Sequence, residues 1–353
     1  MRVSSRSLLL SLLFTAACGA PPEPSAAREE RPAAGLVDHH VHLLSPGLIR
    51  DWKAIGATFS KPDAAYLSAD ELLRDPDGEG PELPALAQAL LVPMAHFYGN
   101  EELRGGLALS AEEEAARAAA ENDHVAAEAA RWPGRAATLV SVDLLRPWAL
   151  AELERVRVRH PIVGVKLHLG SAGFDFRDEH HVATLATLVD WTARERLLLL
   201  LHLDPQRRGT TVADVTALLE RVFAPHPDLE VIIAHLGGSG GFGPWPRSVV
   251  ATCGEWLDER AKRGEPRRGY RFDLSAVPMT KPSEGMAASS DEEIAALAPL
   301  LREVGLDRML FGSDWPVFDP RGHAQFLRER CGFAPAEIEQ LLAQRCSAFA
   351  TPR

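Results

Sequence analysis

Short apolar runs recur along the chain from Leu36 onward, and longer segments of mixed polarity separate them. Most of these runs are almost continuously hydrophobic, which is typical of strands that are buried on both faces of a parallel sheet. We find eight of them, at residues 36–43, 88–95, 136–143, 161–168, 197–204, 229–236, 270–277 and 308–314. The pattern therefore predicts eight parallel strands.

The segments between the runs have the pattern of helices. Several begin with a capping box, in which a serine is followed three residues later by a glutamate. These pairs are Ser68 with Glu71, Ser110 with Glu113, and Ser290 with Glu293. The helix after Ser110 is rich in alanine, has acidic residues in its first turn and is predicted to stop at Pro133-Gly134.

Eight alternations of strand and helix over about 310 residues indicate an α/β fold, a single-domain (β/α)8 TIM barrel at residues 35–353. An open doubly wound sheet is the alternative. It normally has a glycine-rich turn after its first strand, and VHLLSPG at residues 41–47 is not one. Roughly 40 residues separate the first two runs, which is long for such a connection. Their aromatic residues Trp52, Phe59 and Tyr66 are predicted to form part of a lid over the barrel mouth.

The N-terminus has the pattern of a secretory signal, predicted at residues 1–17. Arg2 and Arg6 precede an apolar run, and small residues lead to Cys18. TAAC, at residues 15–18, resembles a bacterial lipobox, in which the cysteine is lipid-modified. Residues 18–34 are rich in proline, alanine and charge, which predicts a disordered tether. We therefore expect an extracytoplasmic lipoprotein, anchored by its N-terminal lipid at the outer membrane or on the periplasmic face. A plain signal peptide that is cleaved nearby is the alternative.

Charge and cysteine content exclude two classes of function. The formal net charge is −11 and no basic block stands out, which argues against nucleic-acid binding. Cys253, Cys331 and Cys346 are far apart and lack CxxC spacing, so a cysteine-type zinc site is not expected. Buried free thiols are the expectation, although two of these cysteines could pair in an oxidising compartment.

Polar side chains end five of the eight apolar runs. His40 and His42 end the first, Lys166 and His168 the fourth, His202 the fifth, His235 the sixth and Asp314 the eighth. Active-site residues of barrels lie at the carboxyl ends of strands, so these side chains are predicted to converge. Strand alternation places Asp38, His40 and His42 on one face and turns His39 toward the helix layer. Asp38 is expected either to be structural or to orient a ligand imidazole, and Asp273 and Ser275 are candidates for substrate contact.

Taken together, the motifs DHHVH, GVKLH, LLLHLD, IIAHLGG and FGSDWP resemble those of the metal-dependent amidohydrolase superfamily. ENDHVAAEAARWPGR and FGSDWP are similar to its TIM-barrel branch related to aminocarboxymuconate-semialdehyde decarboxylase. The resemblance covers Leu36 to Ala350. The set of motifs in this strand order is specific, whereas each motif alone is weak.

The resemblance implies a role for each of the strand-end residues. His40, His42, His202 and Asp314 would bind one divalent metal ion, with zinc as the first candidate, manganese or iron as alternatives, and a second ion left open. His235 would bind that second ion or act as acid and base with Asp314. Lys166 would be a ligand only if carboxylated, and would otherwise anchor substrate or pair with a carboxylate. His168 and Trp315 are the predicted substrate-binding residues.

The sequence therefore favours a hydrolase whose metal-activated water cleaves a C–O or C–N bond of a small ester, lactone or amide. The alternative is a metal-dependent non-oxidative decarboxylase of a small carboxylic acid. An arginine would then be expected to grip the substrate carboxylate, and Arg50, Arg146 and Arg321 are the candidates. A non-catalytic binding lipoprotein is a third hypothesis, from another class. Substrate identity and oligomeric state stay open.

Overall fold

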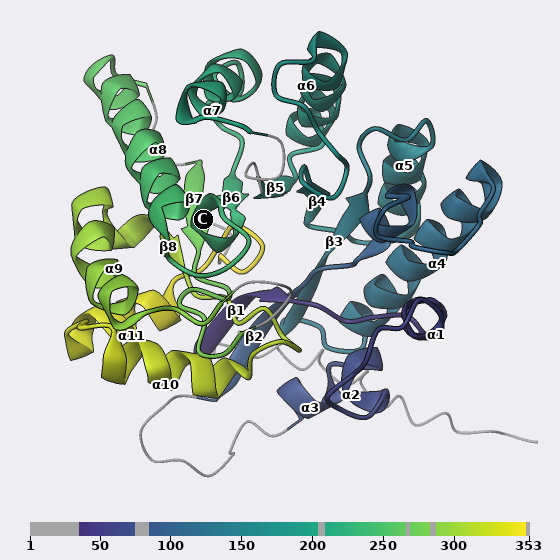
Figure 1. Ribbon diagram of the computed structural model, residues 1–353, viewed down its shortest axis with the longest axis horizontal. Helices are drawn as coiled ribbons and strands as arrows, with labels where there is room; N and C mark the ends of the chain where they lie inside the picture. Colours follow the sequence, from purple (N-terminus) through teal and green to yellow (C-terminus); the bar gives the residue numbers. More distant parts are fainter. Residues whose placement is uncertain (1–34, 75–84, 204–208, 266–268, 283–286, 351–353) are drawn as a thin grey trace, which may run out of the picture. The chain divides into compact units, whose positions relative to one another are not determined.

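The computed structural model describes residues 35–74, 85–203, 209–265, 269–282 and 287–350 (Figure 1). The predicted signal peptide, Cys18 and the predicted tether lie outside these residues. Among the described helices, none combines the length and apolar character that crossing a bilayer requires. The barrel lies in the unit that spans residues 34–353.

The predicted barrel is confirmed: within the described residues, eight strands form one parallel sheet in chain order. Hydrogen bonds from His39 to the carbonyl of Phe311 and from His42 to that of Trp315 bring the last strand back to the first. In Figure 1 the helices stand around this ring. The strands are β1 Leu36–Val41, β2 Leu86–Leu91, β3 Ala136–Val142, β4 Gly164–His168, β5 Leu198–His202, β6 Val231–Ile233, β7 Tyr270–Asp273 and β8 Met309–Leu310.

The last three strands end earlier than the apolar runs predict. Four non-glycine residues after them have left-handed backbone conformations, with φ values of 51° to 63°. They are His235, Leu236, Ala276 and Asp314. Such conformations are costly for residues with a Cβ and do not continue a strand. The chain therefore leaves the sheet where its polar side chains begin.

The helices follow the predicted alternation, with the long connection after β1 folded into short helices. They are α1 Pro46–Ala54, α2 Ala64–Leu67, α3 Asp70–Leu73, α4 Ala111–Ala130, α5 Ala149–Arg159, α6 Glu179–Arg194, α7 Val212–Leu218, α8 Pro244–Lys262, α9 Asp291–Val304, α10 Pro320–Arg330 and α11 Pro335–Ala343. Shorter 3-10 segments are η1 Ala95–Gly99, η4 Ala234–Gly237 and η5 Leu306–Arg308, and η3 Leu219–Phe223 is a π-helical turn.

Two of the three predicted capping boxes are confirmed, at Ser110 before α4 and Ser290 before α9. The prediction at Ser68 is wrong. Helix α3 begins one residue later than predicted, with Ala69 as its N-cap, so Glu71 does not occupy the position that a capping box needs. Ser68 instead accepts a hydrogen bond from the backbone of Asp70.

The strands bury apolar side chains on both faces, as the continuous runs predict. Outward side chains such as Val140, Val165 and Leu199 belong to the large cluster that includes the helices. The opposite face of the strands supplies a second cluster, which Cys346 and Phe349 join from the segment after α11. This segment, yellow in Figure 1, crosses the centre of the ring of strands. It therefore covers the barrel interior at one end.

The predicted direction of His39 is wrong. Its ring does not pack among the helices: Nδ1 donates to the carbonyl of Phe311, and Nε2 accepts from the backbone of Cys346. The ring also meets Phe349 edge-on, with centroids 6.2 Å apart. The register of β1 against β2 is irregular between Asp38 and Val41, so the strict alternation used for the prediction does not hold there.

The expectation of free thiols is confirmed. Cys253, Cys331 and Cys346 are all buried and unpaired among the described residues. Burial raises the pKa of Cys253 to about 12, which leaves its thiol protonated and unreactive.

Candidate active site

His40 and His42, at the end of β1, turn their Nε2 atoms toward each other. Nδ1 of His40 lies 2.8 Å from a carboxylate oxygen of Asp273, and Nδ1 of His42 lies 2.8 Å from the carbonyl oxygen of Val92. These oxygens accept, so each Nδ1 carries the hydrogen and each Nε2 is left with a lone pair. The two Nε2 atoms face each other at 3.1 Å.

Asp314 lies beside this pair. One of its carboxylate oxygens is 3.7 Å from Nε2 of His40 and 3.4 Å from Nε2 of His42. Burial opposes its ionisation, but the hydrogen bond with His42 and the neighbouring histidines hold the pKa of Asp314 below its usual range. The backbone N–H of Asp314 donates to the carbonyl of His40, which fixes the carboxylate against β1.

His235 follows β6 and joins the same cluster. Its Nδ1 lies 2.7 Å from the carbonyl oxygen of Ser275, so its Nε2 also keeps a lone pair. One donor atom from each of His40, His235 and Asp314 falls within 4.8 Å of the others. The structure thus places His235 in one group of donor atoms with two of the predicted ligands, His40 and Asp314.

Asp273 and Ser275 hold this cluster together from behind. Both are fully buried, so neither is placed to touch a substrate. Asp273 accepts from Nδ1 of His40, from the backbone of His235 and from the hydroxyl of Ser275. Burial opposes its charge, yet the neighbouring His40 lowers the pKa of Asp273. Asp273 therefore orients the imidazole, which was one of the two roles that the sequence left open for Asp38.

Asp38 contacts backbone and no imidazole. One of its oxygens accepts from the N–H groups of His40 and Ser313, so it ties β1 to the segment that carries Asp314. Burial raises the pKa of Asp38 to about 7. Its contribution to the site is the position of the main chain.

His202 and His168 lie next to the cluster, at the ends of β5 and β4. Their rings stack with centroids 3.7 Å apart, and the ring of His202 lies 4.7 Å from that of His235. Nε2 of His202 is buried and has no hydrogen-bond partner among the described residues. Burial holds the pKa of His202 well below its usual value, so its ring is neutral and one of its two nitrogens keeps a lone pair.

His96 was missed as a site residue. It follows β2 in η1, its ring lies 5.0 Å from that of His168, and its Nδ1 is 2.9 Å from the hydroxyl of Ser141. A signal for it existed, because His96 follows a predicted strand as the other site residues do.

Lys166 lies on β4 and is 1% exposed. Burial lowers its pKa to about 8, against the opposing influence of Asp273 and Asp314. The structure places it near both carboxylates but within hydrogen-bond distance of neither.

These side chains share a cavity of about 950 Å³. His42, His202, His235 and Asp314 line it together with Lys166 and His168. The predicted lid aromatics form its other wall, with Trp52, Phe59 and Tyr66 in contact with one another or with Phe97. The connection after β1 thus supplies the apolar half of the cavity.

Trp315 is not among the residues that line the cavity. Its ring is buried, and the ammonium of Lys61 lies 4.3 Å from the ring centroid. The following residues Pro316 and Val317 line the cavity in its place. The structure gives no support to the predicted contact of Trp315 with substrate.

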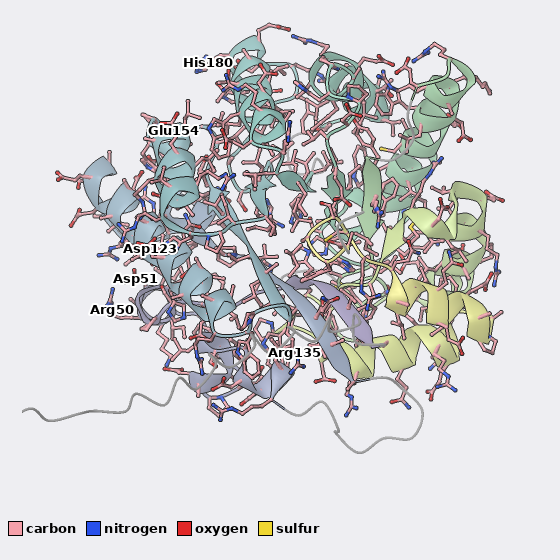
Figure 2. The ribbon with its side chains drawn as sticks, turned by 180° about the vertical axis from the view of Figure 1, so that it is seen from behind. Arg50, Asp51, Asp123, Arg135, Glu154 and His180 are labelled. Carbon is pink, nitrogen blue, oxygen red and sulfur yellow. The ribbon has the colours of Figure 1, made fainter. Side chains whose placement is uncertain are left out.

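No arginine lines the cavity within the described residues. Arg50 is exposed and lies next to Asp51 on the outer side of α1 (Figure 2). Arg146 donates to the carbonyl of Gly99. Arg321 lies in α10. None of these three arginines therefore lies where it could bind a substrate carboxylate in the cavity, as the decarboxylase hypothesis expected.

The donor set fits a divalent metal ion. Two imidazole lone pairs that face each other at 3.1 Å repel unless a cation lies between them. Burial lowers the pKa of His40 to about 3, so its own Nε2 stays unprotonated near neutral pH. The carboxylate of Asp314 and His235 lie beside this pair, and the ring of His202, whose Nε2 is unpartnered among the described residues, lies next to that of His235.

Comparison with known proteins agrees with the fold. The sequence model of the amidohydrolase family matches residues 37–344. A search of curated proteins finds no significant match. Solved structures that resemble the chain include 5-carboxyvanillate decarboxylase from Sphingomonas paucimobilis, at 15% identity and a TM-score of 0.55, covering 88% of this chain and 97% of that one.

Two further structures are similar over comparable lengths. A dihydroxybenzoic acid decarboxylase from a Polaromonas species, with bound manganese and the inhibitor 2-nitroresorcinol, is 17% identical with a TM-score of 0.54, covering 87% of this chain and 94% of that one. A putative 2-pyrone-4,6-dicarboxylic acid hydrolase from Pseudomonas putida is 20% identical with a TM-score of 0.50, covering 88% and 95%. At such identities these structures show the shared fold alone.

The family match covers most of the barrel and includes every strand-end residue of the donor cluster. It confirms the resemblance that the motifs indicate. The chain belongs to the amidohydrolase family.

Proposed function

We propose that the protein is a metal-dependent decarboxylase, which removes carbon dioxide from a small carboxylic acid with an apolar or aromatic body. One observation carries this proposal: histidine and aspartate donors share a cavity with aromatic walls and a buried ammonium group. Aromatic walls suit a flat apolar body, and an ammonium group suits a carboxylate.

The similar structures support this choice over the hydrolase that the sequence favoured. Two of the three described above carry the name of a decarboxylase of an aromatic acid. One of them holds manganese, so manganese stands beside zinc as a candidate metal here. Imidazole and carboxylate ligands are compatible with both ions.

His40, His42, His202 and Asp314 are the residues that we propose would hold the ion, with His235 beside them. A divalent ion there would supply Lewis acidity to a substrate oxygen. In the reaction, the bond between the carboxylate and its carbon breaks. The electron pair stays on that carbon, which takes a proton as carbon dioxide leaves.

The proton has to be handled by the chain's own residues. The low pKa of Asp314 keeps its carboxylate ionised and makes it a weak base at rest, so the proton that reaches the substrate carbon comes from solvent. His235 lies within the same donor cluster, and we propose that its Nε2 takes up this proton and passes it to the carbon. The aromatic wall limits the access of water to the carbon while it carries the electron pair.

A hydrolase is the second candidate, because one of the similar structures is a putative lactone-type hydrolase. The same donors could activate water for attack on an ester, lactone or amide. A binding lipoprotein stays as the candidate from another class, although a binding protein does not need this donor set.

Release of carbon dioxide tests the proposal. Protein loaded with manganese or zinc would be assayed on hydroxybenzoic acids and on an ester, lactone and amide panel. We expect carbon dioxide from at least one acid, and its loss in Asp314→Asn with the fold retained. Hydrolysis without carbon dioxide would establish the second candidate, and inactivity on both panels would favour the binding protein.

A further inference from the structure

Lys166 differs from the other buried cations of the described chain in having no partner. Arg104 is also buried, and it forms an ion pair of 2.8 Å with Glu114. Arg308 likewise lies 3.3 Å from Asp258. Lys166 has neither a hydrogen bond nor an ion pair within 4.0 Å to any described residue, although it lines the cavity.

The nearby carboxylates are committed elsewhere. Asp273 is used by His40, His235 and Ser275, and Asp314 lies against His40 and His42. An unpaired buried ammonium group is expensive, because it has lost its water without gaining a counter-charge. A cavity that keeps such a group therefore fits an anionic ligand.

His168 adds a hydrogen-bond donor on the same strand. It lies two residues after Lys166, so both side chains are on one face of β4. Nδ1 of His168 accepts from the backbone N–H of Ser171, at 3.1 Å, so in the neutral ring the hydrogen lies on Nε2. Both residues line the cavity. Strand β4 thus places the Lys166 ammonium group and the His168 imidazole on the same wall of the cavity.

We propose that Lys166 binds the substrate's carboxylate, on the cavity wall that it shares with His168, and that its charge selects an acid over the corresponding neutral amide. The inference rests on the proposed function and specifies its substrate class: an apolar ring with a free carboxylate. It also accounts for the lack of an arginine among the described residues that line the cavity, since the lysine supplies the positive charge.

Paired probes test this selectivity without any reaction. Benzoate and benzamide have nearly the same shape and differ in charge, and their binding would be measured by calorimetry on metal-loaded and metal-free protein. We expect the wild type to prefer benzoate in both forms. Lys166→Met should weaken benzoate binding by about tenfold or more, the usual range for a charged hydrogen bond, and leave benzamide binding unchanged.

Lys281 supplies a matched control, because it lines the same cavity but is exposed. Lys281→Met should leave the ratio of the two affinities as in the wild type. An equal loss of preference in Lys281→Met would overturn the inference, since general attraction by positive charge would then explain the preference. The inference would also be overturned if the wild type showed no preference for benzoate, or if Lys166→Met kept that preference.

Metal content separates the inference from a carboxylated lysine that binds metal. Lys166→Met should retain the wild-type metal content and melt no lower than the wild type, because replacing an unpaired buried charge removes a cost. If metal is lost together with benzoate, Lys166 is a ligand and the inference fails. Lys166→Gln repeats the test if the methionine variant does not fold. Intact selectivity without carbon dioxide release would instead count against the proposed function alone.

Discussion

Three histidines of the donor cluster present the same nitrogen because an oxygen acceptor holds the other one. His40, His42 and His235 each donate from Nδ1, to Asp273, to Val92 and to Ser275 respectively. The tautomer is thereby set before any ligand arrives, which lowers the cost of assembling the site. At the residue scale, the site is therefore determined as much by these acceptors as by the ligand candidates.

Asp273→Asn tests this dependence. An asparagine can turn its amide toward Nδ1 of His40 and move the ring hydrogen to Nε2, where it would block the lone pair. We expect metal affinity to fall by about 10- to 100-fold, as for other carboxylates behind a ligating histidine. Titration against a competing chelator measures this. Asp38→Asn is the control, since Asp38 contacts no imidazole. An unchanged affinity in Asp273→Asn would contradict the role of Asp273.

His39 makes stability depend on pH from a position outside the donor cluster. Burial lowers its pKa to about 4, whereas a histidine in the unfolded chain takes up its proton near pH 6.5. As pH falls from 6.5 towards 4, the unfolded chain therefore binds a proton that the folded protein does not. The stability lost over this window is about 3 kcal/mol.

His39→Gln removes this titration while keeping a donor and an acceptor. Urea unfolding of both proteins from pH 8 to pH 4 should show the variant less stable at neutral pH, with the gap closing as the pH falls. Curves that stay parallel through this window would show that His39 does not carry the effect.

At the scale of elements, the apolar runs located all eight strands but not where β2 and the last three strands end. The last three runs continue into polar residues with left-handed backbones, and hydrophobicity alone does not report backbone conformation. The strand-end residues were predicted because the barrel fold fixes which end carries chemistry. The roles of Asp273 and His96 were missed because they depend on contacts between strands distant in sequence.

The segment after α11 is a second element whose role became visible only in the structure. Phe349 packs against the inward cluster and against His39. Phe349→Ala should cost about 3–5 kcal/mol of stability, the usual range for a truncated core phenylalanine. Urea unfolding measures the loss, while metal affinity should stay as in the wild type because the donor cluster is not touched.

Val158→Ala provides the control for this truncation. Val158 is 87% exposed on α5, so its truncation should change stability by no more than about 0.5 kcal/mol. A Phe349→Ala variant as stable as the control would mean that the C-terminal segment does not support the barrel.

At the scale of the whole molecule, the motifs predicted the barrel and the family, but not the choice of reaction. Hydrolase and decarboxylase share the donor set, so the choice depends on the cavity, which residues from α1, η1 and the strand ends build together. The aromatic wall was anticipated from the long connection after β1. The lack of a partner for Lys166 among the described residues was not anticipated. It arises because the nearby carboxylates contact histidines instead, and the sequence alone does not show this.

The N-terminal anchor is a prediction about the whole molecule that still rests on sequence. If Cys18 carries lipid, wild-type protein should incorporate labelled palmitate and sediment with membranes, and Cys18→Ser should do neither. Stable sedimentation with membranes requires more than one acyl chain, since a single chain holds a protein at a membrane only marginally and reversibly. Benzoate binding should be the same in both proteins, because the described barrel begins after the predicted tether. Unlabelled wild-type protein with a mature N-terminus other than Cys18 would establish the plain signal peptide instead.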